Sequence, residues 1–320
     1  MRVVALVPGG IGDQILFFPT LDDLKRSYPD ADIDVVVEPR SAGAYRVCKS
    51  VNDVLLYDYK DRNSPADWGN LLGRLRDREY DVAISLGQTW LVGLLLWLTG
   101  INKRVGYAGG GSPFLTDPVP LNKDQYAAAM YHDLLKGMGI TSPCPQLAIN
   151  LPKQDILWAE AEQKRLGITD SGYVLIHGGS SKLAQSKGID KIYPVENWIK
   201  IIQDFQQRQP DVSIVAIAGP EDVELVNKLL EAFPNLKYTA PEDIGKLAAI
   251  IGGASLMLCT DSAPMHLAIA VETYTIALFG PTDPEKLMPK SDRAIAIKSP
   301  TGKMSDISPE TILEKVWGGT

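Results

Sequence analysis

A glycine-rich turn near the N-terminus carries the first side chain that could do chemistry. The segment PGGIGDQIL leads from an apolar run, Val3 to Val7, into a helical pattern that begins at Asp13. Glycine lets a backbone approach a ligand closely, and the positive end of a helix dipole stabilises a carboxylate. Asp13 is therefore a candidate general base, although the turn alone favours a helix cap.

The same turn also matches part of the dinucleotide-binding pattern GxGxxG. Gly10 and Gly12 occupy its first two positions, and Glu38 could stand for the acid that binds the ribose. Ile15 falls at the third position, where glycine permits close contact between helix and strand. We therefore do not expect a dinucleotide site here.

Two strand ends in the second half of the chain offer groups that could bind phosphate or ribose. The strand YVLIH leads into a Gly/Ser loop, where backbone N–H groups and the hydroxyls of Ser180 and Ser181 could bind phosphate. The strand SIVAIA leads to Glu221, which could accept hydrogen bonds from ribose hydroxyls or serve only as a helix-capping acid. Lys191, which precedes the helix at YPVENW, could neutralise a diphosphate or could be a solvated surface lysine.

A third strand end, LMLCT followed by DSAPMHLAIA, is the most informative. Asp261 and Ser262 lie at the turn, and Pro264 suits the first position of a helix. The free N–H groups of this first helical turn could bind an anion, and His266 lies on the same turn. The next strand brings Thr282 to the same edge. Together these residues favour an anion-binding site that includes His266 over a purely structural role for this histidine.

Strands alternate with helices in both halves, which indicates an α/β protein with two doubly wound parallel sheets. The expected strands are 3–7, 33–37, 54–57 and 81–86 in the first half, and 173–177, 213–218, 236–238, 256–259 and 275–279 in the second. Residues 42–48 look helical. The proline-rich segment 143–152 separates the halves, so we expect domains at 1–148 and 149–320, with a final helix, 308–317, that could pack back on the first domain. Ligands bind beyond the carboxyl ends of parallel strands, so the loops of the two sheets would face a central cleft.

Composition narrows the class of protein. The chain has 320 residues, of which 45% are hydrophobic, and its net charge of -7 argues against general nucleic-acid binding. The three cysteines form no CxxC pair, so we expect no zinc site and no disulfide framework, and a reducing cytoplasm suits them. The apolar segment 91–101 is too short to span a bilayer and is expected to be a buried helix. Lys103 and Arg104 follow it directly, which keeps a surface that touches the membrane open as an alternative.

Taken together, these motifs resemble those of the family 9 glycosyltransferases, the heptosyltransferase-like enzymes of lipopolysaccharide core synthesis. The likeness covers nearly the whole chain. It rests on IGDQIL and PTLDDLK near the N-terminus, on YDVAISL and KRVGY, on KIYPVENW and GPEDVE, and most specifically on DSAPMHLAIAVETYTIALFGPTDP.

The resemblance implies a GT-B fold, in which two Rossmann-like domains enclose the active site. The N-terminal domain would bind the acceptor, and the C-terminal domain would bind a nucleotide-sugar such as the ADP-heptose of the heptosyltransferases. Transfer would invert the sugar and need no metal or other cofactor. Asp13 would take a proton from the acceptor hydroxyl, which reverses the preference for a cap. The donor would be held by Ser180, Ser181, Lys191, Asp261, Ser262, Ala263 and His266 around the diphosphate and by Glu221 at the ribose.

Some segments depart from the pattern of the family. Ala263 stands where glycine is common, and SSKLAQSKGIDK is longer than usual. APEDIGK replaces a Gly-Lys-Thr-Ser-like turn. These departures leave the donor sugar and its nucleotide open. The string DADID near Asp30 resembles a metal-binding DxD, but it lies in a polar turn before a strand, so we expect no metal there.

The acceptor would be a lipopolysaccharide core or another glycan, free or linked to lipid. Lys60, Arg62, Arg104 and His132 are candidates to bind its phosphate or carboxylate groups, although each taken singly is more simply a surface charge. Two other functions stay open, namely a nucleotide-sugar epimerase of the same fold and a sugar-nucleotide-binding protein without turnover. We expect a cytoplasmic protein, with peripheral contact at the cytoplasmic face of the inner membrane as an option.

Overall fold

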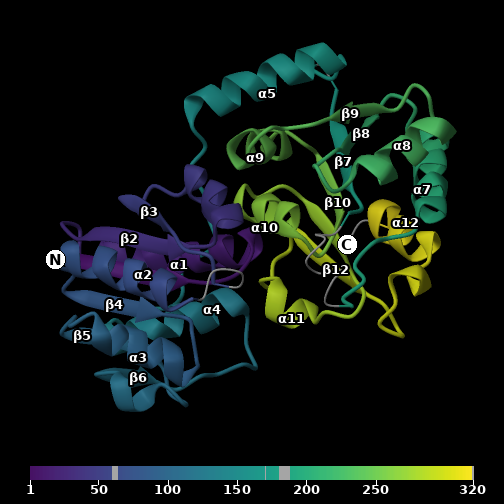
Figure 1. Ribbon diagram of the computed structural model, residues 1–320. Helices are drawn as coiled ribbons and strands as arrows, with labels where there is room; N and C mark the ends of the chain where they lie inside the picture. The colour runs from purple at the N-terminus through teal and green to yellow at the C-terminus, as the bar shows by residue number, and fades with distance from the viewer. Residues whose placement is uncertain (60–63, 170, 180–187, 319–320) are drawn as a thin grey trace. The chain divides into compact units, whose positions relative to one another are not determined.

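The computed structural model describes residues 1–59, 64–169, 171–179 and 188–318. The chain forms two compact units, Met1–Asn150 and Leu151–Thr320. The boundary between them in the sequence lies within the proline-rich segment 143–152. Each unit contains a six-stranded parallel sheet with helices packed against it (Figure 1). The expected α/β class with two doubly wound parallel sheets is confirmed.

The sheet of the N-terminal unit has the strand order β3-β2-β1-β4-β5-β6. The strands are β1 (Arg2–Val7), β2 (Asp32–Val37), β3 (Asp53–Leu56), β4 (Val82–Ser85), β5 (Lys103–Tyr107) and β6 (Asp117–Val119). The helices are α1 (Ile11–Ser27), α2 (Pro65–Asp77), α3 (Trp90–Leu98) and α4 (Ala127–His132), with 3-10 helices η1 (Pro39–Val47), η2 (Ser112–Phe114) and η3 (Asp133–Met138). The apolar run of β1 is fully buried, because this strand pairs with β2 on one side and β4 on the other.

The sheet of the C-terminal unit has the order β12-β11-β10-β7-β8-β9. The strands are β7 (Tyr173–His177), β8 (Ser213–Ile217), β9 (Lys237–Thr239), β10 (Leu256–Thr260), β11 (Thr275–Phe279) and β12 (Ala294–Lys298). The helices are α5 (Lys153–Leu166), α7 (Val195–Arg208), α8 (Val223–Ala232), α9 (Ile244–Gly252), α10 (Ala263–Ala270), α11 (Pro284–Leu287) and α12 (Pro309–Trp317), with the 3-10 helix η4 (Met304–Asp306). The buried strands β7 and β10 lie side by side at its centre.

Each sheet reverses its strand order at one point, between β1 and β4 in the first unit and between β7 and β10 in the second. The loops that leave adjacent strands at such a point diverge to opposite faces, and this opens a crevice in which α/β proteins bind ligands. Asp13 follows β1, and Asp261 follows β10. The topology therefore places both proposed chemical centres at the switch points of their own sheets.

Several elements differ from those expected. Residues 42–48 belong to a 3-10 helix, and β5, β6, β12 and α4 were not anticipated. The last helix, α12, packs on α7 within its own unit, where the rings of Phe205 and Trp317 lie 4.8 Å apart.

The apolar segment 91–101 forms a helix, as expected, but that helix is not buried. Trp90 and Trp97 of α3 are both more than half exposed. Among the residues described, no helix is long and apolar enough to cross a bilayer.

Candidate functional site

Asp13 lies in the first turn of α1, where it caps the helix and also remains accessible. Its Oδ2 accepts a hydrogen bond of 2.8 Å from the Gly10 N–H, which closes a capping box. Its Oδ1 accepts one of 3.1 Å from the Tyr131 hydroxyl. The side chain is half-buried, so the carboxylate is held on both oxygens without being removed from solvent. Cap and base are thus compatible roles for this residue.

Gly9 makes room for the Asp13 carboxylate. Its φ of 123° lies in the region that favours glycine, and a Cβ at this position would fall 2.4 Å from Asp13 Oδ2. The carbonyl of Gly9 also accepts a hydrogen bond of 2.6 Å from the Ser41 hydroxyl. The glycine-rich turn therefore positions a carboxylate at close quarters.

Tyr131, on α4, is a member of this site that sequence reasoning missed. Burial, the negative charge of Asp13 and the hydrogen bond to it raise the pKa of Tyr131 above its ordinary value. The phenol therefore stays protonated and keeps donating to Asp13. Its ring also packs edge-on against Phe17 of α1 at 6.2 Å. No local pattern marks this tyrosine, because it reaches Asp13 across 118 positions of the chain.

The expected acceptor residues do not gather around Asp13 in the described chain. His132 is buried, and its Nε2 donates to Asp23 Oδ2 at 2.7 Å, so its ring serves the interior of the unit. Arg104 turns its guanidinium onto backbone carbonyls, including that of Phe114 at 2.8 Å. These partners hold both side chains in place within the unit, and their role at the acceptor stays a prediction. Lys60 and Arg62 lie outside the described residues.

In the C-terminal unit, three polar side chains at the switch point form a hydrogen-bonded row. His177, the last residue of β7, donates from Nε2 to Asp222 Oδ2 at 3.2 Å. The Ser262 hydroxyl lies 3.2 Å from His177 Nδ1. Since a carboxylate can only accept, Nε2 carries a proton, whereas the Ser262 hydroxyl, which also lies 3.2 Å from the Thr260 carbonyl, can donate to Nδ1 or accept from it.

The Asp222 carboxylate is tightly enclosed. It accepts a hydrogen bond of 3.0 Å from the Gly219 N–H. A Cβ at Gly179 would fall 1.4 Å from Asp222 Oδ1. Burial opposes ionisation here, but the hydrogen bond and charge of His177 and the Gly219 N–H lower the pKa of Asp222 overall. Asp222 is therefore an ionised, buried anchor for His177.

The structure separates two neighbouring acids of the GPEDVE turn. Glu221, the residue expected at the ribose, is exposed, whereas Asp222 is 6% exposed and paired with His177. Glu221 therefore stays available to a ligand. The sequence feature that could have indicated the His177–Asp222 pair is the histidine at the end of β7, because it is a titratable residue after a run of buried apolar residues.

Lys191 forms a partly buried ion pair next to α10, the helix that the sequence analysis assigned to the diphosphate. Its Nζ lies 2.6 Å from Asp261 Oδ2, and the Thr282 hydroxyl donates to the same oxygen at 2.7 Å. Asp261 is 4% exposed. The structure thus joins Lys191, Asp261 and Thr282, which lie in the segments that follow β7, β10 and β11 along the chain.

The helix α10 starts directly after this cluster. Ser262 is its N-cap, but the Ser262 side chain makes no capping hydrogen bond to the helix, because it turns toward His177. Ala263 is half-buried at the first position, and His266 is buried one turn later. The free N–H groups of such a turn suit an anion. The expected phosphate residues Ser180 and Ser181 lie outside the described residues.

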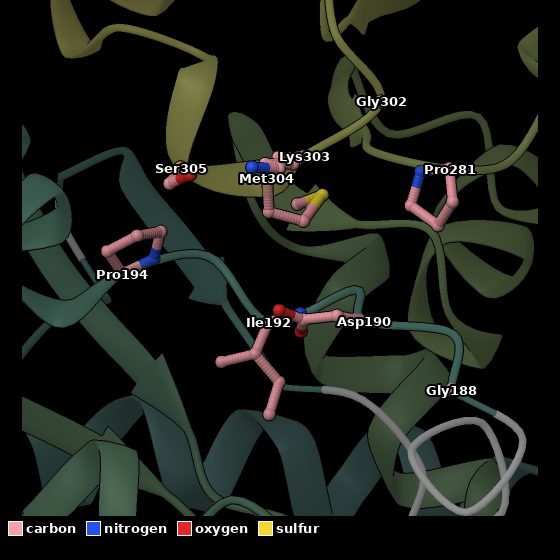
Figure 2. A pocket seen from close by; sticks show the side chains of 9 residues that line it. All are labelled: Gly188, Asp190, Ile192, Pro194, Pro281, Gly302, Lys303, Met304 and Ser305. Carbon is pink, nitrogen blue, oxygen red and sulfur yellow. The ribbon is translucent and has the colours of Figure 1, made fainter.

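The C-terminal unit has a cavity of about 380 Å³, which is lined in part by sequence neighbours of Lys191 (Figure 2). Asp190 and Ile192, the residues on either side of Lys191, line it together with Pro281 and Lys303. It contains none of the expected donor residues. In the described chain no group of three histidine, cysteine, aspartate or glutamate side chains could hold a metal ion.

Comparisons with known proteins give this geometry a context. The model of "Glycosyltransferase family 9 (heptosyltransferase)" matches residues 68–317. "Photosynthetic NDH subunit of subcomplex B 1, chloroplastic" of Arabidopsis thaliana is 27% identical, over 97% of this chain and 72% of its own length. "Lipopolysaccharide heptosyltransferase 3" of Escherichia coli is 26% identical, over 85% of this chain and 81% of its own length.

Solved structures share the fold. A glycosyl transferase family 9 protein from Veillonella parvula matches with a TM-score of 0.85 at 23% identity, covering 98% of this chain and 96% of its own. The E. coli heptosyltransferase WaaC with ADP-2-deoxy-2-fluoro heptose matches with 0.78 at 20% identity over the whole of both chains. UDP-GlcNAc 2-epimerase from Methanocaldococcus jannaschii reaches 0.56 at 14% identity, covering 99% and 92%. The expected GT-B fold of two Rossmann-like domains is confirmed.

Proposed function

This chain belongs to glycosyltransferase family 9, and from that premise we propose that it is an inverting, metal-independent transferase. It moves a heptose-like sugar from an ADP-linked donor to a lipopolysaccharide core or another glycan. The observation that carries the proposal is the pair of prepared sites. A half-buried carboxylate held on both oxygens follows β1 in the first turn of α1, and the first turn of α10, with the Lys191–Asp261 ion pair beside it, follows β10.

The donor is assigned to the C-terminal unit. Its diphosphate binds the first turn of α10, where Ser262 and the backbone N–H groups donate to the phosphate oxygens. Lys191 supplies the opposite charge, and Glu221 accepts from the ribose hydroxyls. Ser180 and Ser181 complete the phosphate loop in this proposal.

The reaction is a displacement at the anomeric carbon of the sugar. The acceptor oxygen forms the new bond while the bond from that carbon to the diphosphate oxygen breaks, and the leaving nucleotide takes the electron pair. Asp13 accepts the proton from the acceptor hydroxyl, a role for which a placed carboxylate contributes about 10²–10⁴-fold. Tyr131 and the Gly10 N–H hold the carboxylate in position for that transfer.

The leaving diphosphate gains negative charge as the bond breaks. Fixed N–H groups and a lysine in a water-poor site stabilise such charge without having to reorganise. Lys191 and the α10 turn are the groups proposed to do this work. For this reason we propose that transfer needs no divalent cation.

Calorimetric titration of ADP, UDP and GDP, each with and without Mg²⁺, tests the proposal on the purified protein. We expect tight binding of ADP alone, unchanged by Mg²⁺. Preference for UDP or GDP would move the donor to another nucleotide-sugar. Binding of none of the three would overturn the nucleotide-sugar assignment.

A second candidate is a family member without turnover. It is favoured by the likeness to the Arabidopsis protein, whose name describes a subunit of a larger complex. ADP binding together with no transfer or hydrolysis of ADP-heptose would support this candidate. Epimerase activity has only the weaker fold likeness in its favour, and conversion of a free nucleotide-sugar without acceptor would reveal it.

A further inference from the structure

Helix α3 presents an apolar face to solvent. Trp90 is 55% exposed, Leu91 43% and Trp97 54%, and Leu94 and Leu98 beside them are half-buried. The nine residues of α3, WLVGLLLWL, include no charged side chain. A helix on a soluble domain normally shows polar residues on its outer side. The outer face of α3 therefore lacks the polar side chains that are usual on a surface in contact with water.

The inner side of α3 is already satisfied by the N-terminal unit. Leu95 and Leu96 are buried in the core beside β5, the strand that α3 accompanies in Figure 1. Gly93 packs so closely that a Cβ there would fall 2.6 Å from the Gly111 carbonyl oxygen. The helix is thus held to the unit by its inner side.

Basic side chains surround the carboxyl end of this helix. Arg76 donates from Nε to the Leu98 carbonyl at 3.0 Å, and Arg104 donates from Nε to that of Phe114 at 2.8 Å. The ring of Phe114 lies 6.4 Å from that of Trp97, so the guanidinium of Arg104 adjoins the apolar face. Arg76, which lines the same hollow as Glu79, and Arg104 donate to carbonyl oxygens, whereas Lys103 is paired with Asp117 at 3.4 Å. The two arginines therefore place positive charge beside the apolar face of a chain whose net charge is -7.

We propose that the outer face of α3 binds the interface of an anionic phospholipid bilayer. The face is defined by Trp90, Leu91, Leu94, Trp97 and Leu98. Tryptophan favours the boundary between acyl chains and headgroups because it joins a large apolar ring to a polar N–H group. A helix with such a face lies in the plane of the interface, and nearby arginines attract anionic headgroups.

The size of the face favours a lipid surface over a protein partner. Its three exposed side chains present on the order of 350 Å² if a free tryptophan presents about 250 Å². A stable protein interface covers roughly 800 Å² on each partner. Insertion into a bilayer interface requires no such matching area, because the lipid adapts to the side chains.

The position of the face adds a functional reason, which rests on the proposed transfer to a glycan on a lipid. Strands β1 and β4 are hydrogen-bonded neighbours, so the loops that follow them leave the same edge of the sheet. The loop after β1 leads to Asp13, and the loop after β4 leads to Trp90 at the start of α3. Trp90, at the start of the proposed membrane-binding face, therefore lies at the sheet edge that carries Asp13, and α1 and α3 leave this edge toward opposite faces of the sheet.

Co-sedimentation with phospholipid vesicles tests the proposal on the full chain, with neither donor nor acceptor present. Vesicles of phosphatidylcholine with and without phosphatidylglycerol are compared at low and high salt. We expect binding to the anionic vesicles and at least about tenfold weaker binding of the double variant Trp90→Gln/Trp97→Gln. Vesicles with brominated acyl chains should quench the tryptophan fluorescence of the unmodified protein.

Two controls isolate the tryptophans. Trp90→Tyr/Trp97→Tyr keeps aromatic rings and should retain most of the vesicle binding. Ile156→Gln/Leu157→Gln removes exposed apolar side chains from α5 and should leave it unchanged. Circular dichroism confirms that each variant is folded. An equal loss in the α5 variant would overturn the assignment to α3.

Light scattering of the protein in solution covers the remaining outcomes. A dimer that the glutamine variant converts to a monomer, without vesicle binding, would overturn the proposal in favour of pairing between copies. A monomer that binds no vesicles would also overturn it. Because no nucleotide is involved, either result leaves the proposed transfer reaction standing, whereas vesicle binding without ADP binding would leave only the membrane proposal.

Discussion

The ammonium group of Lys191 lies 2.6 Å from the carboxylate of Asp261, a residue that is almost wholly buried. The lysine assigned to the diphosphate is therefore neutralised before any donor arrives. The ion pair also fixes the long side chain, which otherwise loses rotamer freedom when it binds a ligand. An incoming diphosphate competes with Asp261 for a cation that is already in position.

Replacing Lys191 tests whether that cation contacts the donor. In Lys191→Met, loss of one charge-assisted contact of about 1.5–3 kcal/mol should weaken ADP binding by roughly ten- to a hundredfold. Calorimetry at two salt concentrations should also show a smaller salt dependence than in the unmodified protein. Lys200→Met removes an exposed lysine of α7 and serves as the control. Equal ADP affinity in both variants would exclude Lys191 from the donor site.

Replacing Asp13 tests the base. Asp13→Asn keeps an oxygen that can accept from the Gly10 N–H but cannot take a proton at neutral pH. Transfer from ADP-heptose to a lipopolysaccharide core acceptor should slow by about 10²–10⁴-fold, with ADP affinity unchanged. Tyr131→Phe, which keeps the ring packing and loses only one hydrogen bond to Asp13, should cost less. A turnover within about threefold of normal for Asp13→Asn would place the base elsewhere.

The two glycines before α1 offer a matched pair for the geometry of the same site. In Gly9→Ala, the new methyl group would meet Asp13 Oδ2 at 2.4 Å and must displace it, so transfer should fall strongly. At Gly10 the corresponding distance is 3.9 Å, and the residue has an ordinary φ of -81°. Gly10→Ala should therefore keep most of the activity. Similar rates for the two variants would show that the position of the carboxylate is not critical.

Asp222 should contribute to stability in a pH-dependent way. Its pKa in the folded protein lies below the usual value of 3.8, because the hydrogen bonds and the charge of His177 outweigh burial. The stabilisation is therefore fully present above that value and is lost as the pH falls through the folded pKa. Asp222→Asn should destabilise the protein by about 1–3 kcal/mol at pH 7. Urea unfolding from pH 7 to pH 3 should show the difference shrinking at the acid end.

Two variants separate this anchoring role from other effects. Glu224→Gln removes the acid of an exposed pair on α8 and should change stability little at any pH. Glu221→Ala should leave stability intact and weaken ADP binding, because the proposed ribose contact belongs to that residue. A difference between Asp222→Asn and the unmodified protein that stays constant down to pH 3 would contradict the ionised anchor.

Much of the fold and part of the site follow from local pattern. The apolar runs of β1, β7 and β10 are short, continuous and followed by glycine or polar turns, which is how parallel strands buried on both faces read in a sequence. The same strands end at the switch points, so Asp13, Asp261 and Ser262 could be named as candidates from the chain alone. In each case the residue type and its position in the turn after a buried strand indicate the chemistry.

Other features needed the tertiary structure, because they join groups far apart in the chain. Tyr131 reaches Asp13 from another helix, and His177 finds Asp222 across 45 positions. The sequence pattern could not show which of Glu221 and Asp222 is buried, since the backbone conformation of the turn decides which of two adjacent acids points into the protein. The sequence pattern also could not show that α3 is exposed on one side. A helix made only of apolar residues has the same pattern whether a protein core or another apolar surface covers it. Local spacing determined which residues end the strands, and only packing decided which of them meet.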